Sequence, residues 1–582
     1  MRLKVTKSKN AASLYVIKSI YNSKTQSNSS KIVEKLGTEA ELREKLNGAD
    51  PYEWAKEYIK KLNEQEKEQT RKILVPFEQS KIILKDEQHS FNGGYLFLQK
   101  IYYELGIPKI CKNISQRYKF NFDLNSILSR LVYSRVIFPS SKLATCELSK
   151  RFIEQPNFDL HQIYRALEVL AKETDFIQSS LYENSLKICK RNTGVLYYDC
   201  TNYFFEIEQE NGSKQYGPSK EHRPNPIVQM GLFMDGNGVP LAFSINRGNM
   251  NEQLTLKPLE KKIISDFELS KFIVCTDAGL ASEANRKFND KDGRAFITTQ
   301  SIKKLKEHLK KWALAKDNWK LPDNEKLYDI SKFDEMLDKA TAEDKAKIRA
   351  KVFYKERWIK ENGFEQRLIV TYSIKYRDYQ RKIRNSQIER AQKAIDNNPT
   401  KIKKCNQNDY KRFIKRTSCT PDGEVAVKEI YSINQDVIQK EEAFDGFYGT
   451  CTNLEDDVSE IIKVNQRRWE IEECFRIMKS EFKARPVYLS NDDRIEAHFI
   501  TCFLSLIIYR LLEKRLNEKY TCHEIISGLR TLEFFDVKGE GYVPTYTRTD
   551  FTDALHEAFG FRTDYQIMVT NKMKKIFTET KK

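Results

Sequence analysis

The spacing of hydrophobic and polar residues changes character several times along the chain. Near the amino terminus, residues 13–21 and 31–36 are rich in β-branched and apolar residues and are separated by a polar, turn-prone segment, which predicts a small β unit. From Asp50 a Lys/Glu-rich helical pattern continues to about Ile73 and predicts a solvated arm. Residues 93–190 repeat apolar side chains at helical spacing, so we expect a mainly helical region there.

Two readings of this helical region remain open. The link Ile137–Lys142 joins two of its short helices, and this arrangement is compatible with a helix-turn-helix unit for double-stranded DNA. Short helices with basic residues are equally typical of an ordinary helical bundle. The sequence alone does not choose between them.

A strand-like pattern begins after Gly194. Short β-branched and aromatic runs alternate with turn signals and helical segments, and residues 235–238 are a hairpin turn signal. Asp199 lies near the middle of the first run, and Asp277 ends the fourth. This element order is that of a ribonuclease-H-like α/β core. The predicted elements are strands at 195–205, 227–234, 239–245, 271–277 and 294–299, with a helix at 251–264 between the third and fourth strands and a second helix between the fourth and fifth.

A long insertion would separate this core from its last part. It runs from about Ser301 to Gln439 and includes a predicted strand pair near 352–359 and 367–374. The segment from Lys375 to Arg416 contains 14 Lys/Arg and four Asp/Glu, which gives it a local charge of +10. Tyr376, Tyr379, Tyr410 and Phe413 are interleaved there, as in a surface that follows a nucleic-acid backbone and stacks on bases; a solvated basic helix is the alternative.

After a predicted strand at 447–452, residues 467–480 predict a helix. At about 100° per residue, Arg468, Glu472 and Lys479 share one face, and Arg476 lies beside them. A carboxylate flanked by cations could belong to a catalytic site. It could equally be a solvated salt-bridge face, which is common on exposed helices.

Composition favours a nucleic-acid partner. The 582 residues include 100 Lys/Arg and 82 Asp/Glu, a net charge of +18 that suits a polyanion. Eleven cysteines without a Cys-x-x-Cys pair indicate buried thiols in a reducing compartment rather than zinc or disulfides. There is no apolar signal region at the amino terminus and no phosphate-binding Gly-Lys-Ser/Thr loop. The apolar run 499–512 is too short to span a bilayer and predicts a buried helix, so we expect a cytoplasmic protein without a membrane partner.

The candidate chemistry rests on three acids. Asp199, Asp277 and Glu472 could meet at one sheet edge, where Mg²⁺ or Mn²⁺ would find the oxygen ligands that hard cations prefer. Phosphoryl transfer by two such ions needs them about 3.5–4 Å apart. Taken singly, an aspartate that ends a strand is more often a cap or turn residue. His498, in the apolar run, is interpreted as a core histidine.

These residues together resemble the DDE transposases of bacterial insertion sequences, in the branch with a Tyr-x2-Arg-x3-Glu-x6-Lys signature. Arg468, Glu472 and Lys479 fit that spacing, whereas Asn465 stands at the tyrosine position. The resemblance covers roughly residues 130–512. Further likeness lies in Tyr198-Asp199-Cys200-Thr201, Gly217-Pro218-Ser219-Lys220, Gly248-Asn249-Met250, Thr276-Asp277-Ala278-Gly279 and Arg485-Pro486-Val487-Tyr488.

The resemblance implies a metal-dependent enzyme that nicks DNA at transposon ends and joins the freed ends to target DNA. It implies that Asp199, Asp277 and Glu472 hold two Mg²⁺ or Mn²⁺ ions. It further implies a homodimer on paired ends and a nucleoid-associated location in a bacterial cytoplasm. Any of Trp312, Trp319 and Trp358 could stack on a displaced base or lie in the core. Expected contacts to DNA or phosphate come from Arg468, Lys479, Arg476, Asn465, Lys220 and Arg223.

The sequence leaves two rival functions open: a catalytically silent DNA-binding relative, and a metal-dependent nuclease of the same fold that cuts without joining. Retention of all three acids with Arg468 and Lys479 argues against the silent relative. The expected domain plan is an N-terminal β unit with a charged arm (1–92), a helical, DNA-binding region (93–192), the first part of the core (193–300), a basic insertion domain (301–440), the second part of the core (441–514) and a C-terminal region (515–582) with a frayed Lys-rich end.

Overall fold

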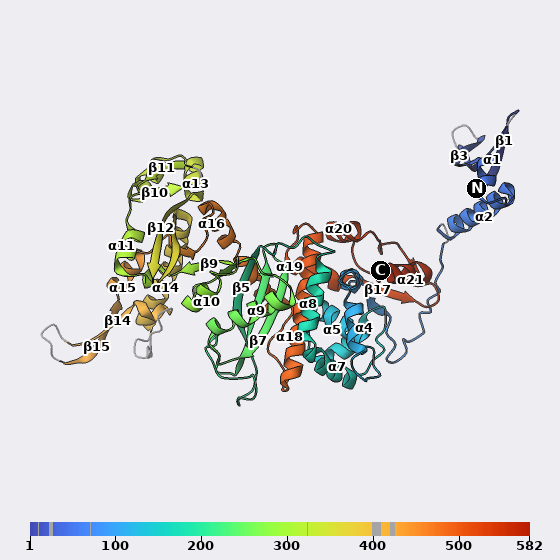
Figure 1. Cartoon of the computed structure of the whole chain (residues 1–582). Coiled ribbons are helices and arrows are strands. Elements are labelled where there is room, and N and C mark those ends of the chain that lie inside the picture. Colours follow the sequence, from blue (N-terminus) through green and yellow to red (C-terminus); the bar gives the residue numbers. More distant parts are fainter. Residues whose placement is uncertain are drawn as a thin grey trace. The chain divides into compact units, whose positions relative to one another are not determined.

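The computed structural model describes residues 1–9, 11–22, 27–69, 72–322, 324–361, 363–397, 409–419 and 425–582. These residues form two compact units, Met1–Glu87 and Gln88–Lys582. The first unit is a three-stranded antiparallel sheet in the order β1-β2-β3 followed by two helices, drawn in blue in Figure 1. Its elements are β1 (Arg2–Lys7), β2 (Ala12–Asn22), β3 (Ser27–Thr38), α1 (Glu39–Lys45) and α2 (Pro51–Gln69).

The predicted β unit and helical arm are both present in this first unit. Strand β1 was not expected from the pattern, because its charged residues alternate with only two apolar ones, Leu3 and Val5, and no turn signal isolates it. Leu14 on β2, Leu42 on α1 and Ala55 on α2 make a small core of their own.

The second unit is built on a ten-stranded mixed sheet. Its strand order is β11-β10-β12-β13-β16-β9-β8-β5-β6-β7, in which β5, β8 and β9 are parallel neighbours and the other pairs are antiparallel. The five strands predicted between 195 and 299 are all found. The strands are β5 (Val195–Phe204), β6 (Ile227–Asp235), β7 (Pro240–Arg247), β8 (Ile273–Thr276), β9 (Ala295–Gln300), β10 (Trp319–Leu321), β11 (Asn324–Tyr328), β12 (Val352–Glu361), β13 (Phe364–Ser373) and β16 (Phe447–Thr452).

Strands from the predicted insertion extend this sheet. β16 pairs with β9 on one side and with β13 on the other, so residues 319–373 continue the hydrogen-bonded sheet of the predicted core. A second apolar cluster, which includes Trp319, Phe353 and Phe447, packs here. The remaining elements of this segment are α11 (Glu307–Leu314), α12 (Phe333–Lys339), α13 (Ala342–Ala350), α14 (Ile374–Asn397), β14 (Ile414–Cys419), β15 (Val425–Ile433) and α15 (Gln435–Glu442).

The two faces of the sheet around β5 pack against different helices. Successive side chains of a strand point to opposite faces. Tyr197 and Tyr203 therefore join the large cluster formed with α18 (Asp492–Arg515), whereas Leu196, Tyr198 and Cys200 pack with α9 (Leu256–Asp266). Asp199 has the same parity as Tyr197 and so belongs to the α18 face.

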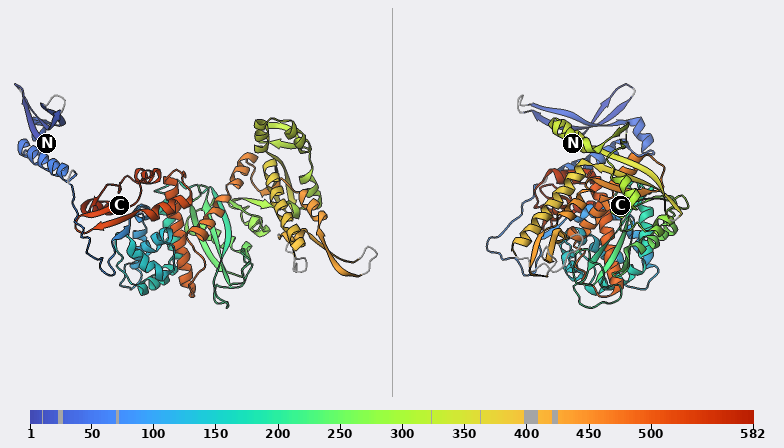
Figure 2. Two further views of the ribbon diagram at one scale, coloured as in Figure 1. Left: turned by 180° about the vertical axis from the view of Figure 1, so that it is seen from behind. Right: turned by 90° about the vertical axis from the view of Figure 1, so that its left-hand side faces the viewer.

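Helix α18 is the centre of the large core. It lies between the sheet and the helices α5 and α7, as Figures 1 and 2 show, and contacts all three. By length and composition this 24-residue helix could cross a membrane, but 94% of its most apolar window is buried in the protein. The expectation of a buried helix is confirmed. The reason differs from the expected one, because the helix is long enough to span a bilayer and only its burial in the protein identifies it as a core helix. The helices of the region before the sheet are α3 (Tyr95–Glu104), α4 (Ile107–Ser115), α5 (Leu124–Ile137), α6 (Lys142–Leu148), α7 (Leu160–Lys172) and α8 (Thr174–Ser185).

The carboxyl-terminal region folds against the same core and is not frayed. A four-stranded sheet, β19-β18-β17-β4, joins residues from both ends of the second unit, and Met573 and Ile576 of the final helix are buried. These elements are β4 (Ser90–Asn92), α19 (Cys522–Thr531), β17 (Glu533–Val537), β18 (Gly541–Pro544), α20 (Asp550–Phe559), β19 (Met568–Val569) and α21 (Thr570–Glu579). The nine cysteines whose side chains the structure describes are free thiols, eight of them buried, as expected; Cys405 lies outside the described residues.

Candidate active site

Two aspartates lie just beyond the point where the parallel pairing of β5 and β8 ends. β5 and β8 pair in parallel with Tyr197 opposite Cys275. Continuing this register by two residues places Asp277, which follows the last residue of β8, beside Asp199. Adjacent strands lie about 4.8 Å apart, so their carboxyl groups are near neighbours on one face of the sheet.

The environment of Asp199 opposes its ionisation. Burial raises its pKa from 3.8 to about 6, the positive charge of Lys220 counteracts this, and the negative charge of Asp277 adds to it. The backbone N–H of Cys200 donates to Asp199 Oδ1 at 2.7 Å. Asp199 is therefore a carboxylate that would gain from a neighbouring cation.

Asp277 has a structural hydrogen bond as well as a candidate ligand role. Its Oδ1 accepts the backbone N–H of Leu280 at 3.0 Å, so it shapes the turn after β8, as the alternative interpretation of a strand-ending aspartate anticipates. The Thr298 hydroxyl on β9 donates to the Asp277 carbonyl oxygen at 3.3 Å. Both contacts fix the position of the carboxyl group.

The third acid lies on a segment that is less regular than predicted. Instead of one helix over 467–480, α16 (Val458–Gln466) ends before a turn, α17 spans Trp469–Arg476, and Ile477–Glu481 forms a π-helical turn. Arg468 precedes α17, and its Nη1 lies 3.2 Å from Glu472 Oε1. Arg468 also lies within electrostatic reach of Asp199 and Asp277. This guanidinium thus links the third acid to the aspartate pair.

The π-helical turn gives Lys479 different neighbours from Glu472. Lys479 Nζ donates to Thr201 Oγ1 on β5 at 2.5 Å and lies 3.7 Å from Glu221 Oε1. Burial, and secondly the positive charge of Lys220, lower the pKa of Lys479 to about 8, against the opposing effect of Asp199. Arg468 also acts on Asp199 electrostatically, so the two cations that were predicted on one face of the helix lie by the same aspartate.

The three acids are not closed around a single point. Glu472 is 56% exposed at its side chain and is paired with Arg468, and Asp199, Asp277 and Glu472 are not among the described groups whose ligand atoms all lie within 4.8 Å. Asp199 and Asp277 fit a hard cation by ligand chemistry and by adjacency. Glu472 would join them by exchanging its contact with Arg468 for the metal.

The other predicted contact residues divide into two groups. Lys220 is beside Asp199 and lies 3.2 Å from Glu252 Oε1, and Asn465 Oδ1 faces Cys275 at 3.8 Å, so both belong to the site. Arg223 stacks on the ring of Phe204 at 4.2 Å and is half exposed. Arg476 is not brought to the aspartates, since it pairs with Glu473 at 2.5 Å and with Glu481 at 3.8 Å.

Aromatic residues of the predicted insertion differ in how far their side chains are exposed. Trp319 and Phe413 are fully buried and cannot stack on a base. Trp312 is partly buried against the second apolar cluster, whereas Trp358 and Tyr379 are 44% and 59% exposed. Residues 398–408 of the basic stretch lie outside the described residues, and Arg377 and Arg384 within it are committed to ion pairs with Asp334 and Asp445 at 2.7 Å.

Sequence reasoning missed Glu221 and Tyr448. Glu221 pairs with both Lys479 and Arg485, and the Tyr448 hydroxyl bonds Thr299 Oγ1 at 2.5 Å near Arg468. Glu221 directly follows the Gly217–Lys220 motif, which was the available signal. No sequence signal pointed to Tyr448, because only the pairing of β16 with β9 brings this residue to the site.

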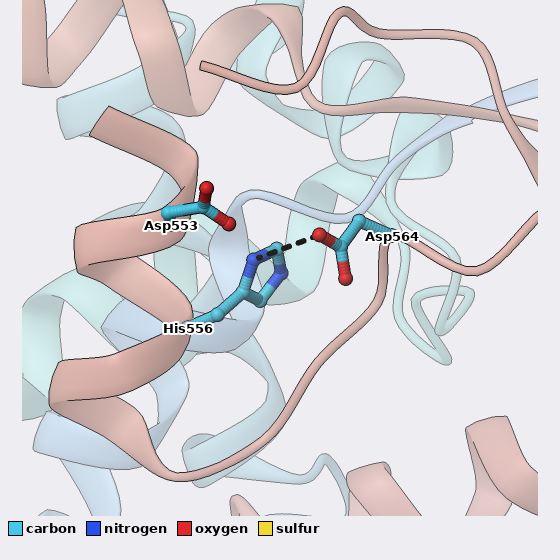
Figure 3. Close-up of side chains that lie close together, drawn as sticks. All are labelled: Asp553, His556 and Asp564. Atoms are coloured by element: carbon cyan, nitrogen blue, oxygen red, sulfur yellow. Dashed lines mark ion pairs between the residues drawn. The ribbon is translucent and has the colours of Figure 1, made fainter. Parts of the chain in front are cut away.

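A second cluster of ligand-type side chains, Asp553, His556 and Asp564, lies in the carboxyl-terminal region (Figure 3). Arg562 bonds both carboxylates, at 2.5 and 2.6 Å. The backbone N–H of Thr563 donates to His556 Nε2, which assigns the proton of the neutral ring to Nδ1, on the side of Asp564. Arg562 thus pairs with both carboxylates, and a metal would have to displace it from them.

Comparison with known proteins finds similarity to transposases. Residues 365–508, about a quarter of the chain, match the family described as "Transposase DDE domain". That segment holds Glu472 and its neighbouring cations but neither aspartate. Among solved structures, the cryo-EM structure of a piggyBac transposase synaptic complex with hairpin DNA is similar at 8% identity and a TM-score of 0.35, covering 75% of this chain and 79% of that one. Curated proteins give no match.

Proposed function

We propose that this protein is a DDE-type transposase of a bacterial insertion sequence, which cleaves element-end DNA and transfers the cut strand into target DNA. The observation that carries the proposal is the placement of Asp199 on β5 and of Asp277 directly after the adjacent parallel strand β8, with Arg468 reaching both of them and Glu472. The match of the Glu472 segment to a transposase DDE domain supports it independently.

In this proposal the sheet order β7-β6-β5-β8-β9 is a ribonuclease-H-like core. Residues 301–440 are its insertion, and residues 93–192 take part in DNA binding. Asp199, Asp277 and Glu472 hold two Mg²⁺ or Mn²⁺ ions, which supply activation of the attacking hydroxyl and stabilisation of the leaving oxygen. The protein acts in the bacterial cytoplasm, and handling two element ends favours a homodimer.

The residues around the acids have defined tasks. Asp199 must be ionised to act as a ligand, and a bound cation would lower its raised pKa. Lys479 and Lys220, both next to Asp199, can neutralise charge that develops on a phosphodiester at this edge. Arg468 pairs with Glu472 through Nη1 and acts on both aspartates, so its guanidinium is placed to bind a phosphate oxygen that enters between them.

The test is cleavage of labelled element-end DNA by purified protein in Mg²⁺. We expect Asp199→Asn, Asp277→Asn and Glu472→Gln each to lose cleavage by about a hundredfold or more while still binding the DNA. Glu473→Gln is the matched control, because Glu473 is the next residue on α17 and pairs with Arg476 away from the aspartates.

The same reaction separates the rival functions. Transfer of the cleaved strand into a second DNA distinguishes a transposase from a nuclease that only cuts, and binding without cleavage by the parent protein identifies a silent relative. Cleavage by all three acid variants at the parental rate would disprove the assigned site.

A further inference from the structure

A cavity of about 390 Å³ lies beside the candidate active site, between the α5–α6 link and the segment that follows the π-helical turn. This volume is in the range of small-ligand pockets. Its lining includes four permanent or potential cations, Arg135, Lys142, Lys483 and Arg485, together with His498, and no aspartate or glutamate of the described part of the chain.

Lys142 has an unusual position in this cavity. Its side chain is only 5% exposed, and its Nζ is buried without a hydrogen-bond partner. Burial, together with the nearby positive charge of Arg135, lowers the pKa of Lys142 to about 7. A buried ammonium group without a partner is costly unless an anion compensates it.

The other polar groups define the walls of the cavity. Arg135 donates to the carbonyl oxygens of Phe482, at 3.0 Å, and Ser140, at 3.2 Å, and thereby ties the two sides together. His498 Nε2 donates to the Ala484 carbonyl oxygen at 3.1 Å, and burial lowers its pKa well below 6.5. The histidine is therefore a neutral wall residue, as the core interpretation predicted, and Lys142 is a buried cation whose Nζ has no hydrogen-bond partner among the described residues.

Side-chain contacts connect the cavity with the reaction centre. Lys479, which is bonded to Thr201 beside Asp199, pairs with Glu221, and Glu221 pairs with Arg485 at the cavity wall. A strand whose phosphodiester lies at Asp199 and Asp277 would have a neighbouring phosphate near this opening. Tyr488, 71% exposed and also part of the lining, is available to contact the attached sugar or base.

We propose that this cavity is a phosphate-binding site in which Lys142 pairs with a phosphate group of the DNA strand engaged at the acids. Recognition of phosphate follows from the cavity itself, whereas DNA as the source of that phosphate rests on the proposed function. Free phosphate or a mononucleotide offers the same chemistry, and the experiment separates these sources.

The first measurement is thermal unfolding of the full-length protein in EDTA, titrated with inorganic phosphate at constant ionic strength. We expect phosphate to raise the midpoint of the parent and of Asp199→Asn. In Lys142→Met the midpoint without phosphate is higher, because the buried unpaired charge is gone, and the response to phosphate is lost. Lys150→Met is the matched control, since it removes the same charge from an exposed lysine eight residues away and should keep the response.

Equal phosphate responses in the parent and in Lys142→Met would overturn the site. Lys142→Gln, which retains a polar end, repeats the comparison if the methionine variant folds poorly.

The second measurement is the affinity for duplex element-end DNA. Lys142→Met should bind about three- to tenfold more weakly than Lys150→Met. Loss of the phosphate response with equal DNA affinity would support a site for free phosphate or mononucleotide and overturn DNA as the source. Because Asp199→Asn reports on the phosphate response without cleavage, failure of the proposed function and failure of this site give different results.

Discussion

At the scale of single residues, the ionised carboxyl group of Asp199 destabilises the native state. Its pKa of about 6 lies above the ordinary value of 3.8, chiefly because the carboxyl group is buried and secondly because Asp277 is beside it. The native state therefore binds the Asp199 proton more tightly than the unfolded chain does. Without metal, stability falls as pH rises from about 4 through 6, and the ionised group remains unfavourable above that.

We expect Asp199→Asn to increase the free energy of unfolding by about 2–3 kcal/mol at pH 7.5 in EDTA, because a neutral amide removes the buried charge. The gain should diminish as pH falls through 6 and be nearly absent at pH 4, where the parental carboxyl group is protonated. Urea unfolding at the two pH values measures this. Mg²⁺ should stabilise the parent more than the variant, and a gain that is the same at both pH values would refute the assignment of the cost to ionisation.

Arg468 is the other residue whose position matters beyond its own helix. It forms an ion pair with Glu472 and reaches both aspartates, so in the metal-free protein its positive charge compensates the three acids, as bound cations would. Its role would change on metal binding, from partner of the third acid to ligand of a phosphate.

At the scale of elements, the placement of α17 depends on α18. Arg510 of α18 donates through Nε to the Gly238 carbonyl oxygen at 2.9 Å and lies 3.5 Å from Glu470 Oε2 on α17. Both side chains of this ion pair are largely buried. One arginine of the core helix thus connects the β6–β7 turn with the helix that carries Glu472.

We expect Arg510→Met to lower the free energy of unfolding by about 2–3 kcal/mol, because it leaves the Gly238 carbonyl oxygen and part of the Glu470 carboxylate buried without their donor. Lys514→Met, one turn further along α18 and paired with Glu518 nearer the surface, should change it by less than about 0.5 kcal/mol. Denaturant unfolding of the two variants tests the difference. Equal effects would mean that Arg510 acts only as a surface charge.

At the scale of the whole molecule, the chain has two independent cores. The cluster around Leu14 and Leu42 contains only residues of Met1–Glu87, whereas the clusters of the sheet and of α18 contain only residues of Gln88–Lys582. Each unit therefore buries its own apolar surface, which is the requirement for folding on its own.

We expect a chain that begins at Gln88 to unfold cooperatively, with the same midpoint as the main transition of the full-length protein. Differential scanning calorimetry of the two proteins measures this, and the first 87 residues should contribute a separate, smaller transition. A large fall in the midpoint of the shortened chain would show that the second unit depends on the first for stability.

Much of the fold and of the candidate site could be predicted from local pattern. The alternation that places Asp199 in a strand and Asp277 at a strand end is written in neighbouring residues, because side-chain direction in a strand repeats every two residues. The apolar run that forms much of α18 was equally easy to recognise in the sequence. The burial of Trp319 and the exposure of Trp358 were not predictable, because both depend on the strands and helices that pack around these residues.

The sequence by itself determined the strands from 195 to 300, the acids on them, the buried helix and the basic excess. Only the tertiary structure decided that β16 joins residues 319–373 to the sheet, that Lys479 lies on a π-helical turn, and that Lys142 is buried at a cavity without a hydrogen-bond partner among the described residues. The reason is physical. Strand pairing, burial and the compensation of charge depend on residues hundreds of positions apart, whereas periodicity depends only on adjacent ones.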